Sequence, residues 1–335
     1  MSQGPWLVTG ASGFLGRHLL NELEAAEHPR RTVALVRETA EWREMDWTGG
    51  LSRVDTLTGS VTETAGWAGD TRLDSLAGIF HLAALVRHSR RDADEVYRTN
   101  VRGTAAMVRL AAERSCRMVF VSTSGTVACF RDPADSADEE SAFCEREVSS
   151  WPYYHSKIEA EREARRLADE LGVELVILRP PVLLGPGDHR FRSTNHVSRF
   201  LRGKLPFLVR GGMHFADVRD AARALVRAMT REQVRPVYHL PGTSSSIEEF
   251  FALTGQVAGR KPPGAVMPSR LAWWMARIGA PLGLLPDPVI IEMAAHYWGM
   301  RSHYVESDLE YRSRPARETL VDTVAWLMAH HPALR

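Results

Sequence analysis

A tyrosine and a lysine four positions apart carry the clearest chemical signal in the sequence. Tyr153 and Lys157 fall within residues 152–171, whose apolar spacing predicts a helix ended by Gly172, so the two side chains project from one face. A phenol has a pKa of about 10, which makes it a poor acid or base at neutral pH, and a neighbouring ammonium group brings it into range. The chain has 7 tyrosines and three lysines, so chance seldom produces this spacing. The pair predicts acid–base chemistry; the alternative is a solvated helix face with a stacked tyrosine.

Three hydroxyl groups follow one another at the end of a predicted strand. Ser122, Thr123 and Ser124 close the apolar run at residues 117–122. In a doubly wound sheet, the carboxyl ends of the strands face the crevice in which ligands bind. A hydroxyl placed there can hydrogen-bond a carbonyl oxygen and stabilise the alkoxide that develops from it. The alternative is that these hydroxyls cap the following turn.

A glycine-rich turn lies between a predicted strand at residues 5–9 and a predicted helix at 13–24. Gly10 permits a tight turn, Gly13 lets the backbone approach a pyrophosphate, and Gly16 allows the helix to pack close to the sheet. A phosphate group can then rest on free N–H groups at the positive end of the helix. The turn predicts a dinucleotide site, against the alternative of a purely structural turn.

The residue after the second predicted strand bears on the choice of dinucleotide. Sites specific for NAD usually place an acidic side chain there to hold the ribose 2′-hydroxyl, whereas this chain has Arg37. An arginine can pair with a 2′-phosphate through bidentate, charge-assisted hydrogen bonds. We therefore favour NADP(H) over NAD(H). The alternative is that Arg37 is merely solvated and that Glu38 holds the ribose.

Apolar runs alternate with helical stretches through the first half of the chain. Further strands are expected at residues 32–36, 54–57, 78–82 and 174–178, and a further helix at 94–113. This alternation predicts an α/β fold, a doubly wound parallel Rossmann sheet with a smaller C-terminal substrate-binding domain. We expect the dinucleotide-binding domain to comprise residues 1–180 and about 213–240, with a helix at 218–229 and a strand at 237–240, and the substrate-binding domain to comprise 181–212 and 241–335.

Charge balance and cysteine content limit the kinds of binding partner and the cellular compartment that we expect. The 42 Lys and Arg residues nearly match the 41 Asp and Glu residues, so no basic surplus points to nucleic acid. We expect no signal peptide at the N-terminus, and the most apolar region, 271–285, is too short and interrupted to span a bilayer. Cys116, Cys129 and Cys144 are expected to be free thiols in a reducing compartment. We expect a cytoplasmic protein without a membrane span and, because the histidines lack ligand spacing, without a metal.

Together, these segments resemble the extended short-chain dehydrogenase/reductase family, which is epimerase/dehydratase-like, over nearly the whole chain. The matching segments are the glycine turn at 9–16, the fourth-strand motif at 81–84, the helix motif at 100–104, the active-site helix at 153–157, the nicotinamide segment at 178–188 and the return to the core at 215–222. Residues 152–157 and 179–181 look closest to the 3β-hydroxysteroid dehydrogenase and dihydroflavonol reductase branch.

The resemblance implies a Ser-Tyr-Lys mechanism in which Ser124, with Thr123 as its rival, joins Tyr153 and Lys157. It implies that the helices at 94–113 and 152–171 pair into a homodimer interface. The residues then expected to contact the cofactor are Thr9, Gly10, Ser12, Gly13, Phe14, Leu15, Gly16, Arg37, Ser60, Val61, Leu82, Ala83, Ala84, Asn100, Ser122, Tyr153, Lys157, Pro180 and Val182.

Three departures from the family pattern bear on the reaction. The third strand leads to Ser60 where the family usually has an adenine-contacting aspartate. Gly125 and Thr126 replace the Asp-Glu pair that dehydrating members carry after the catalytic hydroxyl, so an acid for elimination is missing. Pro180-Pro181 replaces the Phe-Asn of many nucleotide-sugar enzymes. Interconversion of a ketone and a secondary alcohol is the simplest reading.

Large apolar side chains characterise the second half of the chain, with clusters at 271–275, 289–291 and 297–298. They favour a hydrophobic pocket, or a lid at a membrane surface, for a lipophilic or aromatic small molecule. His189, Arg192, Arg199 and Arg202 could meet a polar end of that molecule, although surface arginine is the safer reading. Two alternative functions stay open: a nucleotide-sugar epimerase with tightly bound NAD, and a non-catalytic dinucleotide-sensing module.

Overall fold

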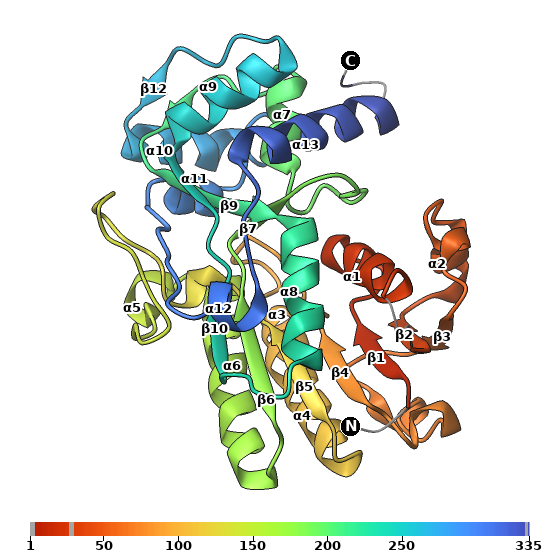
Figure 1. Cartoon of the computed structure of the whole chain (residues 1–335). Helices are drawn as coiled ribbons and strands as arrows, with labels where there is room; N and C mark the ends of the chain where they lie inside the picture. Colours follow the sequence, from red (N-terminus) through yellow and green to blue (C-terminus); the bar gives the residue numbers. More distant parts are fainter. Residues whose placement is uncertain (1–3, 27–29, 332–333, 335) are drawn as a thin grey trace.

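A parallel sheet of seven strands forms the lower half of the molecule in Figure 1, a computed structural model that describes residues 4–26, 30–331 and 334. The order is β10-β6-β5-β4-β1-β2-β3, and every neighbouring pair is parallel. The strands are β1 (Trp6–Thr9), β2 (Thr32–Val36), β3 (Val54–Thr58), β4 (Gly78–His81), β5 (Arg117–Val121), β6 (Leu175–Arg179) and β10 (Val237–His239). The order runs outward from β1 in both directions, which confirms the predicted doubly wound sheet.

Helices cover both faces of this sheet. On one face, α1 (Phe14–Glu24) and α8 (Val218–Thr230) bury Leu19, Leu23 and Leu225 against the strands. On the other face lie α4 (Gly103–Glu113) and α6 (Pro152–Leu171), which bury Met107 and Ala164. Because the sheet meets a helix layer on each side, β1, β2 and β4 are mainly apolar and are buried at every position rather than on alternate ones.

The helix predicted at 94–113 is interrupted in the structure. It consists of α3 (Ala93–Tyr97), a π-helical turn at Arg98–Arg102, and α4. Single π-helical turns inside α-helices are rare and often lie at functional sites. Here the turn contains Asn100, whose side chain is fully buried.

A second, smaller group of elements lies above the sheet in Figure 1. Its three-stranded sheet pairs β7 (Val182–Leu184) with β9 (Gly212–Asp217) and β9 with β11 (Thr243–Ser246). Residue 217 ends β9 and caps α8, so this sheet leads directly into the larger one. Its other elements are α7 (Asn195–Leu201), β8 (Leu208–Val209), α9 (Ile247–Ala258), β12 (Val266–Met267), α10 (Ser269–Gly279), α11 (Pro288–Ala294) and α13 (Ala316–His330). In contrast, α12 (Val305–Leu309) lies beside β10 in Figure 1 and buries Val305 and Leu309 in the core that α8 covers.

Two sequence-based expectations concern the chain as a whole. Across the described ranges, no helix combines the length and apolar character needed to cross a bilayer. Cys116, Cys129 and Cys144 are free thiols, the latter two buried and Cys116 partly exposed.

Candidate active site

A cavity of about 750 Å³ opens at the carboxyl ends of the central strands. Of the residues expected to contact the cofactor, its walls contain Thr9, Gly10, Ser12, Gly13, Phe14, Leu15, Gly16, Arg37, Ser60, Val61, Leu82, Ala83, Ala84, Ser122, Tyr153, Lys157, Pro180 and Val182, and they also contain Ser124. Asn100 is the exception, because it lies behind the wall. The structure therefore gathers residues that are up to about 170 positions apart around one space, at the place where doubly wound sheets bind their ligands.

The glycine turn forms a cradle that side chains would fill. Gly10 has a φ of +72°, and a Cβ atom on it would lie 2.7 Å from the backbone nitrogen of Ala83. A Cβ on Gly16 would lie 2.3 Å from the carbonyl oxygen of Gly10. Gly13 stands at the N-cap of α1, and no side chain caps the helix there. The first N–H groups of α1 therefore remain available for an anion, so the turn fits the diphosphate of a dinucleotide.

A buried hydrogen-bond chain holds this turn against the end of β4. The hydroxyl of Thr104 donates to the carbonyl of Asn100 at 2.6 Å, so its oxygen accepts from Nε2 of His81 at 3.0 Å. Nδ1 of His81 then accepts from the hydroxyl of Thr9 at 2.8 Å, and the Thr9 oxygen accepts from the N–H of Ala83 at 3.2 Å. Burial, with a smaller contribution from the charge of Lys157, lowers the pKa of His81 to about 3, so the ring stays neutral and the direction of each bond is fixed.

Asn100 connects the loop after β4 to the active-site helix. Its side-chain oxygen accepts from the N–H of Leu85 at 2.8 Å, and its amide donates to the Leu85 carbonyl at 3.2 Å and to the Ser156 hydroxyl at 2.9 Å. The Ser156 hydroxyl in turn donates to the carbonyl of Tyr153 at 2.7 Å. Asn100 thus positions the wall of the cavity through its neighbours rather than lining the cavity itself.

The edge of the cavity at β2 and β3 contains the residues expected near the adenosine half. Arg37 is exposed and lines the cavity, whereas Glu38 does not. Ser60 hydrogen-bonds the hydroxyl of Thr62 at 2.9 Å, and Val61 is buried against α4, where a Cβ on Gly103 would lie 2.7 Å from it. The cationic side chain at the end of β2 is the one that faces the cavity.

Tyr153 and Lys157 lie one turn apart on α6, which begins at Pro152. Lys157 is 2% exposed, and its ammonium donates to the carbonyl of Val121 at 2.8 Å. Burial lowers the pKa of Lys157 to about 7, although the carboxylate of Glu161 acts in the opposite direction. Burial also raises the pKa of Tyr153 to about 12, so the phenol carries its proton at neutral pH. The pair can therefore donate a proton into the cavity.

The three hydroxyls after β5 have different surroundings. Thr123 caps the short turn at residues 124–126, because its side-chain oxygen accepts from the N–H of Gly125 at 3.4 Å. Ser122 donates to Glu161 at 2.5 Å. Ser124 is buried in the cavity wall, and within residues 4–26, 30–331 and 334 its hydroxyl has no hydrogen-bond partner. Thr123 also lines the cavity, and its weak bond with Gly125 uses its oxygen only as an acceptor, so both hydroxyls can donate to a ligand, and Ser124 remains the expected one.

Comparison with known proteins agrees with this geometry. Residues 6–240 match the model of the NAD dependent epimerase/dehydratase family. The chain belongs to this family. A dihydroflavonol 4-reductase from Zea mays is 33% identical over 196 residues, which are 55% of this chain and 54% of that relative. A 4-hydroxy-2-methyl-3-oxo-4-farnesyl-3,4-dihydroquinoline-1-oxide ketoreductase from Stigmatella aurantiaca is 30% identical over 280 residues, 82% of this chain and 79% of the relative.

A solved structure extends the likeness to the full chain. The crystal structure of gox2253 superimposes with a TM-score of 0.82 at 26% identity, covering 97% of this chain and 98% of that one. The predicted membership of the extended short-chain dehydrogenase/reductases is thereby confirmed, and the chain is an NAD(P)-dependent enzyme of that type.

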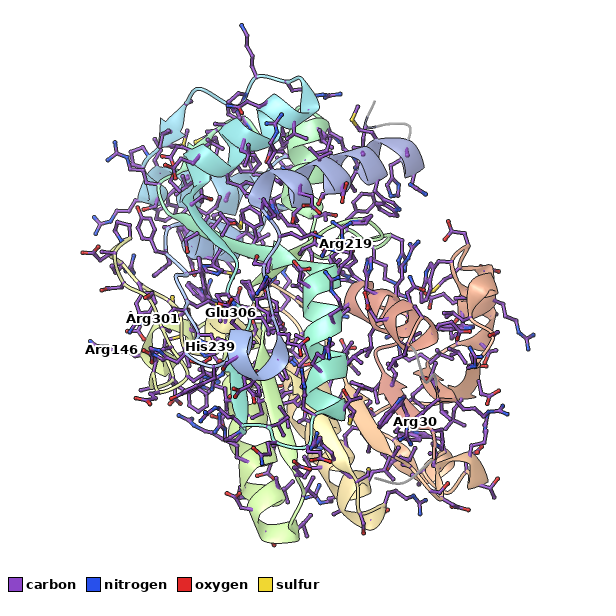
Figure 2. All side chains as sticks on the ribbon, in the orientation of Figure 1. Arg30, Arg146, Arg219, His239, Arg301 and Glu306 are labelled. Carbon is purple, nitrogen blue, oxygen red and sulfur yellow. The ribbon has the colours of Figure 1, made fainter. Side chains whose placement is uncertain are left out.

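A buried ion-pair network behind the active-site helix escaped the sequence analysis. Glu161, fully buried, accepts from Arg179 at 2.6 Å, from Ser122 at 2.5 Å and from Thr126 at 3.2 Å. Arg179 also contacts Nε2 of His239, whose Nδ1 donates to the carbonyl of Arg301; Figure 2 labels His239 and Arg301 near the end of β10. The network connects α6, β5, β6 and the C-terminal segment in this family member, around the strand ends that present Ser124.

One sequence signal could have indicated this network. Glu161 follows Lys157 by four positions, so both lie on the helix face that meets the sheet. A carboxylate predicted on the buried face of a helix needs a cationic partner. His88, also missed, packs edge-on against the Tyr153 ring at 5.5 Å, and burial lowers the pKa of His88 to about 4. Its place in a loop after β4 has no sequence pattern to reveal it.

The remaining walls of the cavity are mostly apolar and come from the smaller group of elements. They include Phe207, Leu285, Ile290, Ile291, Met293 and Trp298. Arg192 and Arg199 line the cavity as well, whereas His189 and Arg202 do not.

The cluster at 271–275, expected in the pocket wall, lies outside it. The reason is that α10 turns Ala272 and Ala276 inward against Phe207 and Ile291.

One group of side chains has the spacing of metal ligands, outside the cavity. Glu145, His155 and Glu159 place their ligand atoms within 4.8 Å of one another. Arg162 pairs with Glu145 at 2.5 Å and with Glu159 at 2.7 Å, and Tyr97 hydrogen-bonds His155 at 2.6 Å. These partners already satisfy the three groups, so the cluster supports no metal site, and the absence of a metal stays a prediction.

Proposed function

We propose that the protein is an NADP(H)-dependent oxidoreductase that interconverts a ketone and a secondary alcohol on a hydrophobic or aromatic small molecule. The observation that supports this proposal is the convergence of Ser124, Tyr153 and Lys157 on one cavity whose far walls are mostly apolar. Family membership supplies the class of cofactor, and the cavity supplies the class of substrate.

Each of the three residues has a distinct task in the reduction. The bound nicotinamide supplies the hydride for the carbonyl carbon. The Ser124 hydroxyl donates a hydrogen bond to the carbonyl oxygen and stabilises the charge that develops on it. Tyr153 donates its proton to that oxygen, which completes the alcohol. The Lys157 ammonium, on the next turn of α6, stabilises the phenolate left behind, and oxidation runs through the same groups in reverse.

Arg37 supports the choice of NADP(H). Its guanidinium lines the cavity at the end of β2, where an adenosine ribose lies in dinucleotide sites of this fold. The acidic neighbour, Glu38, is not among the residues that line the cavity. A 2′-phosphate would therefore meet a cation, and a 2′-hydroxyl would meet no carboxylate from this strand.

The relatives favour a lipophilic ketone over a nucleotide-sugar. The Stigmatella relative is named as a ketoreductase of a farnesyl-bearing ring system. A nucleotide-sugar epimerase with tightly bound NAD is the second candidate, because the family includes epimerases. Pro180-Pro181 weighs against it, since this pair replaces the Phe-Asn of many nucleotide-sugar enzymes, whereas Gly125-Thr126 weighs only against dehydration. A non-catalytic dinucleotide sensor is the third, and the complete Tyr-Lys pair weighs against it.

A substrate screen tests the proposal. The purified protein is given NADPH and a panel of lipophilic and aromatic ketones, with nucleotide-sugars as the control panel, and loss of nicotinamide absorbance is followed. We expect turnover with members of the ketone panel and none with the nucleotide-sugars. Tightly bound NAD in the purified protein, together with a rise in Tm caused by nucleotide-sugars, would instead establish the epimerase.

A further inference from the structure

Helix α10 and the turn after it expose large apolar side chains to solvent. Of the nine large hydrophobic side chains that the described part of the chain exposes, six lie between residues 271 and 284. Ile278 is 71% exposed, Leu282 70% and Leu284 68%. We call these six residues the α10 face: Leu271, Trp274, Met275, Ile278, Leu282 and Leu284. A soluble protein rarely leaves so many apolar side chains together in water without a binding role.

The orientation of α10 is the reverse of an ordinary surface helix. Ala272, Ala276 and Gly279 form its buried side and pack towards Phe207 and Ile291. The large side chains at 271, 274, 275 and 278 follow the i, i+3, i+4, i+7 spacing of a single stripe, and that stripe points outward. Helices that pack on a core bury their large apolar residues and expose their small or polar ones. The outward stripe therefore has the form of a contact surface.

The chain segment that contains this stripe carries positive charges only, although Glu292 of the neighbouring α11 accepts from the indole N–H of Trp273 at 2.7 Å. Residues 250–286 contain Arg260, Lys261, Arg270 and Arg277 but no aspartate or glutamate, in a chain whose charges otherwise balance. In the described ranges, none of these four cations forms an ion pair with a carboxylate. Arg260 donates to the carbonyls of Leu201 and Leu334, so the exposed cations on α10 itself are Arg270 and Arg277. Arg277 instead lies over the rings of Trp273 and Trp274, at 5.5 and 5.7 Å from their centroids. The α10 face thus combines exposed apolar side chains and indole rings with cations that have no carboxylate partner.

We infer that the α10 face binds the surface of an anionic lipid bilayer. Amphipathic helices that lie in the plane of a membrane place Leu, Ile and Trp among the acyl chains and Lys or Arg at the headgroups. Anionic headgroups would neutralise the cations that lack carboxylate partners. A second copy of the chain would bring the same cations together, so self-association through this face is disfavoured.

The α10 face adjoins the active-site cavity. Leu284 belongs to the face, and the next two residues, Leu285 and Pro286, line the cavity. Arg199, another lining residue, donates to the carbonyl of Leu284 at 3.4 Å. A lipophilic substrate dissolved in the bilayer would therefore meet the cavity where the protein meets the membrane. This last step rests on the proposed function, whereas membrane binding by the face does not.

Vesicle sedimentation without substrate or cofactor tests the inference. The full-length protein is mixed with vesicles of phosphatidylcholine alone or of phosphatidylcholine with phosphatidylglycerol. We expect it to sediment with the phosphatidylglycerol vesicles, less with the neutral ones, and progressively less as salt is added. Protein that stays in the supernatant with both vesicle types at low salt would overturn the inference.

Substitutions on the face separate it from the rest of the surface. The double variant Ile278→Asn, Leu282→Asn changes two side chains that are about 70% exposed, so its folding should be preserved. We expect its partition coefficient between vesicles and water to fall at least about tenfold, because moving only two methylene groups from the bilayer into water already gives that factor. The matched control Leu171→Asn, Val321→Asn makes the same change at exposed positions on α6 and α13 and should bind like the wild type.

Two further measurements distinguish membrane binding from self-association through the α10 face. Arg270→Glu should reduce the preference for phosphatidylglycerol vesicles while leaving the weaker binding to neutral vesicles. Wild-type sedimentation by the Ile278→Asn, Leu282→Asn variant would overturn the inference. A second outcome would also overturn it: the wild type binds no vesicles and forms a dimer in analytical ultracentrifugation, and the double variant is a monomer. A second copy of the chain would then cover the face. Vesicle binding in a protein that reduces no ketone would leave the inference intact and count against the proposed function alone.

Discussion

The hydroxyl of Tyr153 is the single atom on which the proposed proton transfer depends. We expect Tyr153→Phe to lower kcat at least about 100-fold, since general acid catalysis typically contributes a factor of that size or larger. NADPH affinity, measured by fluorescence titration, should be unchanged. Tyr154→Phe is the matched control, because Tyr154 is buried against Gly125 and Trp298 and should affect turnover little. Full activity in Tyr153→Phe would contradict the mechanism.

Arg37 carries the prediction about the cofactor. Removing a guanidinium that binds a phosphate costs about 1.5–3 kcal/mol, so Arg37→Ala should raise the Kd for NADPH by roughly ten- to a hundredfold. The Kd for NADH should stay the same. Glu38→Ala is the control and should change neither value. If Glu38→Ala instead weakens NADH binding and Arg37→Ala has no effect, the carboxylate holds the ribose.

At the scale of residues, the sequence was sufficient to identify site residues that belong to short local motifs. The glycine turn, the hydroxyls after β5 and the Tyr-Lys pair each lie in a short segment with its own spacing, and the structure gathers them around one cavity. The choice between Ser124 and Thr123 stays a prediction, because both hydroxyls line the cavity and neither donates its hydrogen to a described acceptor. Glu161 and His88 were missed because their partners lie on distant segments, brought near only by the fold.

At the scale of elements, Glu161 connects the active-site helix to the strands beneath it. Its carboxylate is fully buried and is the charge that opposes the lowering of the Lys157 pKa. Glu161→Gln should lower the free energy of unfolding by about 3 kcal/mol or more, because it leaves Arg179 as an unpaired buried charge. It should also lower the Lys157 pKa further, so the alkaline limb of the kcat/KM profile for reduction moves to lower pH by about one unit.

A matched variant on the same helix separates these two effects from a general disturbance. Glu159→Gln changes a partly exposed carboxylate of α6 that pairs with Arg162. We expect it to leave both the unfolding free energy and the pH profile close to wild type. A Glu161→Gln protein that is destabilised but keeps the wild-type profile would assign Glu161 a structural role alone.

Element boundaries show where sequence patterns stop being informative. The central strands β1, β2 and β4 were predictable because they are short, mainly apolar runs buried at every position, whereas the edge strand β3 is only partly buried. The stretch at 94–113 reads as one continuous helix, yet a π-helical turn divides it, because Asn100 must reach Leu85 and Ser156. The orientation of α10 was also not predictable. Its apolar cluster left a pocket wall and a lid at a membrane surface open, and the packing of Ala272 and Ala276 shows that the stripe faces outward rather than into the pocket.

At the scale of the whole molecule, the doubly wound sheet followed from the alternation of strands and helices, whereas association with other molecules did not. The pairing of residues 94–113 and 152–171 into a homodimer stays a prediction, which sedimentation equilibrium would check. A lid at a membrane surface was one of two interpretations of the cluster at 271–275, and the exposures that favour it for the α10 face come from the structure. Both concern surfaces, where the sequence constrains packing least.

Buried histidines make the stability of the whole fold depend on pH. Burial lowers the pKa of His18, His88, His196, His214 and His239 to about 4 and that of His81 to about 3. An unfolded chain binds protons at these rings near pH 6.5, so below that value the unfolded state takes up protons that the folded state excludes. Stability is therefore fully present above about pH 6.5 and falls as the pH drops towards about 4.

The measurement is guanidinium unfolding at a series of pH values between about 7 and 5, a window above the range in which carboxylates titrate. We expect the free energy of unfolding to fall by several kcal/mol, since each excluded proton contributes about 1.4 kcal/mol per pH unit. His214 accepts from the N–H of Gly242 at 2.8 Å, so His214→Gln should reduce the slope. His303→Gln should leave it unchanged, because that ring is half exposed. A flat profile across this window would mean that the fold opens to admit the protons before it unfolds.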